Sequence, residues 1–487
     1  MMELLSPAGN VQKLEYCYRY GADAAYIGLK NFSLRVKADN FYEDEYKRVC
    51  QLKEQFPGRK LHCALNISFH NAELDRLQKE LPYFKNYPID AFIVQDLGIV
   101  PLLQKEFPNA ALHLSTQASC MNREAVKMYK SLGFSRVVMG REASLAEIKE
   151  IKDAVPDMEI ECFVHGAMCI AYSGRCLMSA YINGRSAQEG FCSHTCRWDF
   201  DVLSPSHCDD TSRDYTPQAR AIAQSGALVL REHKRPDEYF PIFEGDNFTA
   251  VLSSKDLCMV DHLADLRDAG VDSLKIEGRM KSVYYVALVT RAYRKALDAL
   301  EGRISKEEAE PFIQELYHAS HRQYATGFYY NAQEADVAVS GESKSQFELA
   351  ALLGSECEAS VAEEIFSRSS FLEQKREKEY EAMVPQAKAA FKKAVEAHPD
   401  TYLPGVTKKE GWIFYDIEML NIIDAKSEVQ VVTPDECAFD LSHEQFQLVN
   451  PQTGEVYRWV CADHPCVLYT KLRLPQGAIL RTKSTLR

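Results

Sequence analysis

Residues 136–164 have the sequence RVVMGREASLAEIKEIKDAVPDMEIECFV, and this stretch decides the fold class. The apolar runs at its two ends, Arg136–Met139 and Glu159–Val164, are typical of strands, while Leu145–Asp153 between them has a helical pattern. Ser144 and Glu147 form the S-x-x-E capping box that begins many helices. The stretch therefore predicts a strand–helix–strand unit with parallel strands and a right-handed crossover.

The same alternation continues on both sides of this unit. Further strands are expected at Met2–Leu5, Ala24–Leu29, Leu61–Ile67, Ala91–Val94, Ala111–Ser115 and Ser273–Ile276. Most are rich in Val, Ile, Leu and Phe without strict alternation, which is typical of strands buried on both faces. Helical patterns at Val11–Tyr20, Glu73–Phe84 and Arg123–Leu132 lie between them. Eight such strands predict an α/β fold, a TIM-like (β/α)8 barrel. An open, doubly wound sheet would give a similar pattern and is the alternative.

The eighth strand follows the seventh only after a long interval, which predicts a large insertion at about 167–272 within a barrel domain at 1–330. Residues 331–487 have short apolar runs separated by turn residues such as Asn450-Pro-Gln-Thr-Gly454. They predict a small C-terminal β-barrel-like or sandwich domain. Its segment 371–397 is rich in Glu, Lys and Ala, and predicts a solvated helical insertion.

Composition and charge argue against several classes of protein, among them membrane proteins and secreted proteins. The chain has 487 residues, of which 46% are hydrophobic, and lacks the roughly 18 uninterrupted apolar residues that a membrane helix needs. Its N-terminal residues lack the basic and apolar regions of a secretory signal. We therefore expect a cytoplasmic protein with no membrane partner. The net charge of −13 argues against nonspecific coating of nucleic acid but permits a local basic patch.

Four of the fifteen cysteines are close together in the insertion, at Cys169, Cys176, Cys192 and Cys196, with the spacing C-x6-C-x15-C-x3-C. A reducing cytosol does not favour disulfides. Structural zinc usually takes two tight pairs of ligands, and only the last two cysteines are so spaced. An iron–sulfur cluster also takes four thiolates and tolerates irregular spacing. A nucleophilic cysteine would need one thiol and a base such as His165 or His194. The spacing favours the cluster but leaves all three uses open, and Cys258 could replace one ligand.

Barrel enzymes place functional groups where the strands end. Strand ends and the insertion supply Arg35, Asn66, Gln95, Asp96, Gln117, Arg141, Glu142, His165, Arg175, Arg185, Arg197, Glu277 and Arg279. Each could be an ordinary ion pair or loop cap. The abundance of arginine, whose planar fork suits carboxylates and phosphates, indicates an anionic small molecule, a phosphodiester chain or both. We assign catalytic roles to Arg141, His165, Glu277 and Arg279, and substrate binding to Arg35, Gln117, Arg175 and Arg197.

A run of basic residues begins within the eighth strand: Lys275, Arg279, Lys281, Arg291, Arg294 and Lys295. Helical spacing divides the run between faces, which favours an ordinary solvated helix over an RNA-binding patch. The H-E-x-x-H and G-x-S-x-G signatures of hydrolases are absent.

Several of these segments together resemble a known family. They are the motif Glu161-x-Phe-x-x-Gly-Ala-Met-Cys169-x4-Gly174-x-Cys176-x-Met-Ser179, the opening Glu3–Gly9, the segment Gly21–Gly28 and Lys275-Ile-Glu-Gly-Arg279. Over about residues 1–330 the chain resembles the collagenase-like peptidases of family U32. Within that family, Tyr172–Cys176, Tyr181–Asn183 and Thr195–Trp198 are most similar to the bacterial prephenate-dependent tRNA uridine hydroxylases.

The resemblance implies hydroxylation of carbon five of the wobble uridine, with the tRNA anticodon loop as partner and prephenate as co-substrate. It also implies a [4Fe–4S] cluster on Cys169, Cys176, Cys192 and Cys196. Other members hydroxylate a quinone precursor or ribosomal RNA. A peptidase acting on collagen-like chains and a noncatalytic cluster-bearing partner remain alternatives. The C-terminal part matches the family poorly, and the sequence leaves the oligomeric state undetermined.

Overall fold

The structure is a computed structural model that divides into two compact units, Met1–Lys344 and Ser345–Arg487. It describes residues 2–30, 32–33, 40–169, 171–176, 178–179, 192–193, 195–197, 200–203, 229–232, 235–241, 255–330, 345–397 and 403–483. No helix among these residues is long and apolar enough to cross a membrane.

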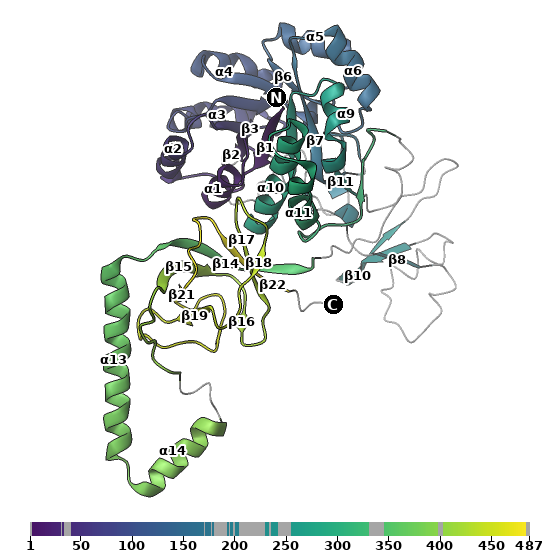
Figure 1. The fold of residues 1–487 in the computed structure, drawn as a ribbon. Coiled ribbons are helices and arrows are strands. Elements are labelled where there is room, and N and C mark those ends of the chain that lie inside the picture. Colours follow the sequence, from purple (N-terminus) through teal and green to yellow (C-terminus); the bar gives the residue numbers. More distant parts are fainter. Residues whose placement is uncertain are drawn as a thin grey trace. The chain divides into compact units, whose positions relative to one another are not determined.

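The first unit is built on a closed barrel of eight parallel strands (Figure 1). They are β1 (Glu3–Pro7), β2 (Ala24–Gly28), β3 (Lys60–Leu65), β4 (Ala91–Val94), β5 (Ala111–Leu114), β6 (Arg136–Val138), β7 (Glu159–Ala167) and β12 (Ser273–Ile276). The barrel closes because β12 pairs in parallel with both β1 and β7, with Ser273 opposite Glu3 on one side and Glu161 on the other. The predicted barrel is confirmed, and the open sheet is wrong.

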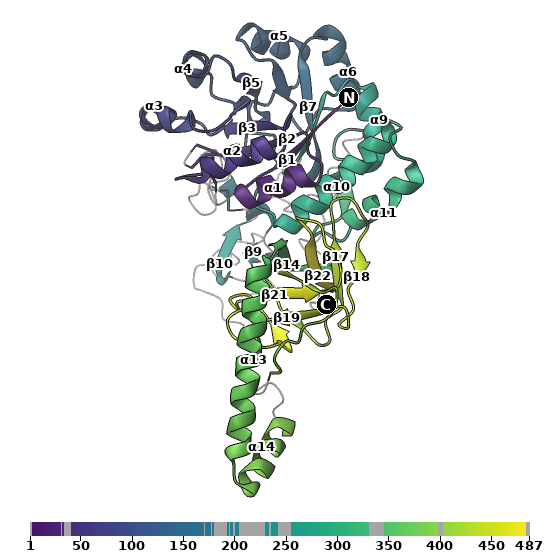
Figure 2. The ribbon, with the colours of Figure 1, turned by 60° about the vertical axis from the view of Figure 1, so that its left-hand side comes forward.

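Helices surround these strands in both ribbon views (Figures 1 and 2). They are α1 (Val11–Arg19), α2 (Glu45–Gln55), α3 (Asn71–Phe84), α4 (Val100–Glu106), α5 (Arg123–Ser131), α6 (Leu145–Ala154), α9 (Leu263–Asp268), α10 (Val283–Leu300) and α11 (Lys306–Leu316). The capping box at Ser144 is present as predicted, with the Ser144 hydroxyl accepting from the Glu147 N–H and the Glu147 carboxylate accepting from the Ser144 N–H. The cap fixes where α6 begins and so the length of the loop after β6.

The basic run after β12 is not the solvated helix face that the sequence suggested. Lys275, Arg279 and Arg291 are only 4%, 3% and 1% exposed. Arg291 lies on α10, whose residues are buried almost all round, and forms an ion pair with Glu315 of α11 at 2.5 Å. For Arg291 the prediction was wrong because α11 packs against α10, whereas Lys281, Arg294 and Lys295 are half-buried.

The long interval between β7 and β12 contains two kinds of strand. β11 (Asp256–Cys258) pairs antiparallel with β7 and parallel with β13 (Tyr324–Ala325), which extends the barrel sheet at this point. β8 (Phe200–Leu203), β9 (Val229–Glu232) and β10 (Arg235–Pro241) form a separate antiparallel sheet. The sequence did not predict any of these strands.

The second unit is an antiparallel half-barrel sheet in the order β18-β17-β22-β14-β15-β21-β19. Its strands are β14 (Phe347–Glu356), β15 (Ile413–Met419), β17 (Val429–Val432), β18 (Phe439–Asp440), β19 (Phe446–Val449), β21 (Val467–Thr470) and β22 (Ile479–Lys483). A two-stranded sheet of β16 (Ile423–Asp424) and β20 (Trp459–Val460) accompanies it. The core consists of apolar side chains such as Val431, Leu468 and Leu480, each fully buried.

The helical insertion consists of two helices, α13 (Ala359–Ala382) and α14 (Pro385–Ala397), and begins earlier than the predicted residue 371. Pro385 is the first residue of α14, where the missing N–H costs no helical hydrogen bond. Within its own unit α13 projects away from the sheet (Figure 2). Only Ile365 and Ser369 of α13 are buried, so most of the helix surface faces solvent, as the composition indicated.

Candidate active site

A cavity lies at the end of the barrel where the parallel strands finish, the end at which barrel enzymes place their chemistry. Its lining comes from β2 to β7, from β12 and from the residues that follow them. The lining residues are Tyr26, Ala64, Asn66, Ile93, Ser115, Thr116, Gln117, Val138, Arg141, Phe163, Lys275, Glu277 and Arg279. We call this the barrel cavity. It brings together five of the strand-end residues that the sequence predicted: Asn66, Gln117, Arg141, Glu277 and Arg279.

The barrel cavity is positively charged although the chain is acidic. Arg141, Lys275 and Arg279 contribute three cationic groups against the one carboxylate of Glu277. Partly dehydrated cationic groups attract an anion more strongly than solvated ones do, because the local dielectric constant is lower. The cavity is therefore suited to a small anionic ligand.

Arg141 is held in place by two contacts. Its Nη1 donates to the carbonyl oxygen of Ala167, at the end of β7, over 2.8 Å. The guanidinium carbon lies 3.9 Å from the centroid of the Phe163 ring, a stacked cation–π arrangement. These contacts reduce the side-chain entropy that a flexible arginine would lose on binding a carboxylate.

Arg279 is accommodated by two glycines. A Cβ at Gly28 would lie 2.1 Å from Nη1 of Arg279, and a Cβ at Gly9 would lie 2.2 Å from its carbonyl oxygen. Any larger residue at either position would displace Arg279 from the barrel end. Gly9 ends the opening segment Glu3–Gly9, and Gly28 ends the segment Gly21–Gly28. Both segments belong to the family resemblance described above, and their glycines make room for a third such segment, Lys275–Arg279.

Beneath the cavity, the barrel interior contains a chain of buried ion pairs. Lys275 Nζ lies 2.6 Å from Oε1 of Glu161, and Arg136 contacts the other oxygen of Glu161 at 3.0 Å and Glu3 at 2.5 Å. Burial alone would raise the pKa of Glu3, but the Arg136 guanidinium outweighs it and lowers this pKa to about 2. Glu161 is fully buried, and its pKa is lowered for the same reason by Lys275 and Arg136.

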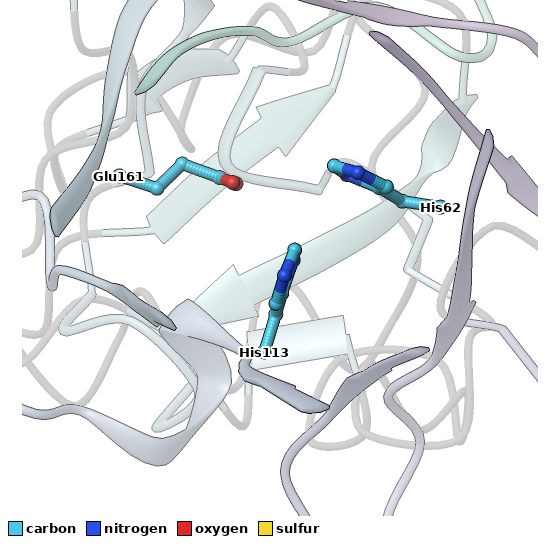
Figure 3. A group of neighbouring side chains, drawn as sticks. All are labelled: His62, His113 and Glu161. Atoms are coloured by element: carbon cyan, nitrogen blue, oxygen red, sulfur yellow. The ribbon is translucent and has the colours of Figure 1, made fainter. Parts of the chain in front are cut away.

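His62 and His113 point toward Glu161 inside the barrel (Figure 3). The ligand atoms of the three residues lie within 4.8 Å of one another, a separation that could hold a metal ion. Burial lowers the pKa of His62 to about 4 and that of His113 well below its usual value, so both rings are neutral. Because both Glu161 oxygens already contact cationic side chains, a further cation at this point would be repelled. The group is better explained as part of the polar interior than as a metal site.

His165 lies apart from the barrel cavity. Its Nε2 is 3.3 Å from the hydroxyl of Tyr324, its Nδ1 is 3.5 Å from the hydroxyl of Tyr293, and burial lowers its pKa to about 3. Cys258 is opposite His165 in the β11–β7 pair, and its Sγ is 3.9 Å from the same Tyr293 hydroxyl. Both residues are therefore enclosed by α10 and β13, whereas the sequence placed His165 among the catalytic groups at the barrel end.

Part of the cysteine segment, which we define as residues 169–196, packs against the cavity wall. A Cβ at Gly174 would lie 2.0 Å from the carbonyl oxygen of Gln117, so only glycine permits this contact, and Gly174 also has φ = +77°. The Ser173 N–H donates to Glu142 at 2.8 Å, and the Ser119 hydroxyl donates to the Ser173 carbonyl. Arg175 is exposed, with Nε 3.4 Å from the Ser119 hydroxyl.

The four predicted metal-binding cysteines are free thiols that are exposed or half-buried. Burial raises the pKa of Cys176, and Cys169 and Cys192 raise it further. Ser179 also approaches Sγ of Cys192 at 3.7 Å. In the described part of the chain the four do not form a compact group for one metal ion, as His62, His113 and Glu161 do. As a donor set, four free thiols in one segment are the ligand type that an iron–sulfur cluster takes, and such a cluster is larger than a single ion.

Some predicted residues lie outside the described part of the chain. They are Arg35, Arg185, His194 and the side chain of Arg197. Conversely, the sequence did not indicate the interior residues Glu161, His62 and His113 as a group, and Lys275 was expected in a solvated basic run. The available signal was a charged or polar residue inside an apolar run, as in Ile160-Glu-Cys-Phe-Val164 and Ser273-Leu-Lys-Ile276. Strands buried on both faces rarely contain such residues without a partner.

Comparison with protein families gives a match over residues 9–338 to Peptidase family U32. The chain is 40% identical over 337 residues to the tRNA hydroxylation protein P of Escherichia coli, and the match covers 67% of this chain and 74% of that protein. It is 38% identical over 331 residues to the tRNA hydroxylation protein P1 of Bacillus subtilis, and this match covers 67% of this chain and 70% of that protein. A third relative, the 23S rRNA 5-hydroxycytidine C2501 synthase of Escherichia coli, is 33% identical over 342 residues, and this match covers 69% of this chain and 46% of that protein.

Proposed function

The chain belongs to peptidase family U32, and we propose that it is an RNA-modifying hydroxylase rather than a peptidase. Its substrate in this proposal is the wobble uridine of tRNA, hydroxylated at carbon five in a prephenate-dependent reaction. The names of the bacterial relatives, two tRNA hydroxylation proteins and one rRNA hydroxycytidine synthase, support the choice of RNA and of hydroxylation.

One observation carries the proposal furthest: the cysteine segment packs directly on the wall of a cationic cavity. Gly174 lies against Gln117 of the cavity lining, and Ser173 is held by Glu142 beside Arg141. Cys169 and Cys176 flank these contacts in the sequence, which supports a cluster close to the place where a small anion would bind.

In the proposed reaction Arg141 and Arg279 bind the two carboxylates of prephenate. Both line the cavity, and both are fixed, Arg141 by Phe163 and Ala167 and Arg279 by its fit against Gly9 and Gly28. Gln117 and Glu277 line the same cavity, and they would orient the ligand and the base. The anticodon loop suits such an enzyme because its bases are unstacked and accessible. Tyr172 of the cysteine segment is 65% exposed and would be available to stack on a base.

Cys169, Cys176, Cys192 and Cys196 would hold a [4Fe–4S] cluster, which supplies one-electron transfer when bound. A peptidase, in contrast, would need a nucleophile beside a general base. The described lining of the barrel cavity contains no cysteine or histidine. Of its two aliphatic hydroxyl groups, that of Thr116 donates to the carbonyl oxygen of Met139, and that of Ser115 accepts from the Gln117 N–H as a helix cap. This lining gives no support to the alternative of a collagenase-like peptidase.

The test uses a bacterial strain that lacks its own tRNA hydroxylases. Expression of the full chain should restore hydroxylated wobble uridine, measured by mass spectrometry of tRNA nucleosides, and restoration should fail in a strain unable to make prephenate. Gelatin cleavage by the purified protein without any restored nucleoside would replace the proposal by the peptidase.

The cluster is tested by the metal content of anaerobically purified protein. We expect iron and acid-labile sulfide in near-equal amounts, lost when Cys169, Cys176, Cys192 or Cys196 is replaced by Ala. Cys120→Ala is the matched control, because Cys120 is a buried barrel cysteine outside the cysteine segment and should cost only packing. Zinc without sulfide would contradict the cluster proposal. If Cys258→Ala loses the cluster while Cys196→Ala retains it, the fourth ligand is Cys258 and not Cys196.

A further inference from the structure

The reaction proposed above gives no role to Lys275. It lies on β12 and lines the barrel cavity, yet it is only 4% exposed. Its Nζ is 4.6 Å from the centroid of the Tyr26 ring and 5.5 Å from that of Phe163, and both rings line the same cavity. The amine nitrogen is therefore held between two aromatic walls at the inner end of a site suited to an anion.

The groups around this nitrogen permit proton transfer. Oε1 of Glu161 accepts a hydrogen bond from Nζ at 2.6 Å, and Glu161 is itself fully buried. Burial lowers the pKa of Lys275, the Glu161 carboxylate opposes this effect, and the guanidinium groups of Arg136 and Arg279 lower the pKa further. A dehydrated lysine near other cations loses its proton more readily than a solvated one, and lysines in such sites act as nucleophiles.

We propose that Lys275 forms a Schiff base with the carbonyl group of a 2-oxo carboxylic acid bound in the barrel cavity. The geometry gives each part of such a molecule a partner. One of the two arginines, Arg141 or Arg279, suits the carboxylate beside the carbonyl group, and the other suits a second carboxylate such as that of prephenate. Lys275 suits the carbonyl carbon, and the rings of Tyr26 and Phe163 suit an apolar remainder. A simple carboxylic acid or a phosphate would use the arginines but leave the amine without a reaction partner.

The step needs no oxidant or reductant. The Lys275 ammonium passes one proton to the Glu161 carboxylate, and the freed electron pair forms a C–N bond to the carbonyl carbon while the carbonyl π electrons move to oxygen. The oxygen takes up the proton held by Glu161 and a second proton from the nitrogen, and it leaves as water. A protonated C=N bond remains, with the Glu161 carboxylate as its counter-ion.

This inference deepens the proposed function and rests on it for the identity of the natural ligand, because prephenate contains a 2-oxo acid group. A covalent bond at Lys275 would hold the co-substrate in one orientation and would make its carbonyl carbon electron-poor. The bond would also distinguish 2-oxo acids from the many other carboxylates of a cell, which the arginines alone cannot do.

The experiment is reductive trapping on the full-length protein. The protein is incubated with pyruvate, phenylpyruvate or prephenate in the presence of sodium cyanoborohydride, which reduces an imine to a stable secondary amine. Peptide mass spectrometry should locate the adduct on Lys275 ahead of the exposed lysines. Lactate, which has the carboxylate but no carbonyl, should give no adduct.

Two variants complete the test. Lys275→Arg keeps the cation but cannot form an imine, so the adduct should be lost while the melting temperature shows whether the fold is retained. Lys152→Arg is the matched control, because Lys152 Nζ also has a carboxylate partner, Asp272 at 2.7 Å, but lies outside the cavity lining, and trapping at Lys275 should persist. Since the wild-type adduct is mapped directly, a poorly folded variant does not decide the outcome.

The results separate this inference from the proposed function. No adduct at Lys275 with any of the three acids, in protein that still hydroxylates tRNA, overturns the Schiff base and leaves the hydroxylase standing. An adduct at Lys275 in protein that restores no hydroxylated uridine supports the Schiff base and overturns the proposed hydroxylase.

Discussion

The interior of the barrel and the core of the C-terminal sheet are built from different kinds of side chain. The barrel encloses Glu161, Lys275, Arg136, His62 and His113, all at most 4% exposed. The C-terminal sheet encloses a cluster of apolar residues, and the buried polar side chains described in that unit are three threonines, Ser369 and the single charged residue Arg481. Ordinary barrel interiors are filled by layers of branched apolar residues, so the exception is the barrel.

The difference indicates which unit contains the chemistry. A buried ion pair repays its dehydration only with good geometry, and apolar residues of similar size often stabilise a protein as well or better. The charged interior is thus poorly explained by stability alone. It lies directly below the barrel cavity and fixes Lys275 there, whereas the C-terminal core is accounted for by apolar burial.

The largest expected effect is on the barrel ion pairs. Glu161→Ala leaves Lys275 and Arg136 buried without this carboxylate, and should lower the free energy of unfolding of the barrel unit by about 3–5 kcal/mol. Peptide-resolved hydrogen exchange should show lost protection in the barrel strands but not in the C-terminal sheet. A change below about 1 kcal/mol would mean that the interior charges do not depend on one another.

The corresponding change in the second unit is Leu468→Ala. Leu468 is fully buried in β21, and its truncation should cost about 2–5 kcal/mol through lost apolar contact and the cavity left behind. In the same hydrogen-exchange experiment, protection should now fall in β14, β15 and β21 while the barrel strands keep theirs. Equal loss in both units would show that they unfold together and would weaken the comparison.

A third change addresses the cavity without disturbing either core. Arg141→Lys keeps the charge but loses the planar fork that stacks on Phe163, so use of prephenate should weaken by roughly ten- to hundredfold, or about 1.5–3 kcal/mol. The measurement is the prephenate concentration that gives half-maximal hydroxylation of tRNA. Arg123→Lys, at an exposed position on α5, is the control and should change nothing.

The smallest effect is a pH dependence confined to the barrel. His62 has a folded pKa of about 4 against 6.5 when solvated, so protons bind preferentially to the unfolded chain. Its contribution to stability is complete above pH 6.5 and decreases as the pH falls toward 4. Lowering the pH from 7.5 to 6 should cost the barrel about 1 kcal/mol from this residue alone.

The C-terminal unit provides the internal reference for that measurement, because none of its described histidines is fully buried. Hydrogen exchange, corrected for the pH dependence of intrinsic rates, should show protection decreasing only in barrel strands. His62→Phe should remove part of the dependence, and an unchanged slope in this variant would assign the effect to other groups.

Many elements were predictable because their signals are local. The expected strands Ala91–Val94 and Ser273–Ile276 have the observed bounds, and the capping box at Ser144 begins α6. In contrast, β11 and β22 were missed. β22 pairs with both β14 and β17, and nothing in its own five residues indicates that central position.

The sequence by itself determined the α/β barrel, the cluster of cysteines and several strand-end residues of the cavity, among them Arg141, Glu277 and Arg279. Periodicity, capping and spacing lie within short stretches of chain, and parallel strands that end at one edge bring their following residues together. Only the tertiary structure decided which side chains face inward. It placed Lys275 against Glu161, 114 residues away in the chain, and turned His165 toward Tyr293 instead of the cavity. Such pairings depend on barrel closure and strand register, and shifting the register by one residue turns each side chain to the other face.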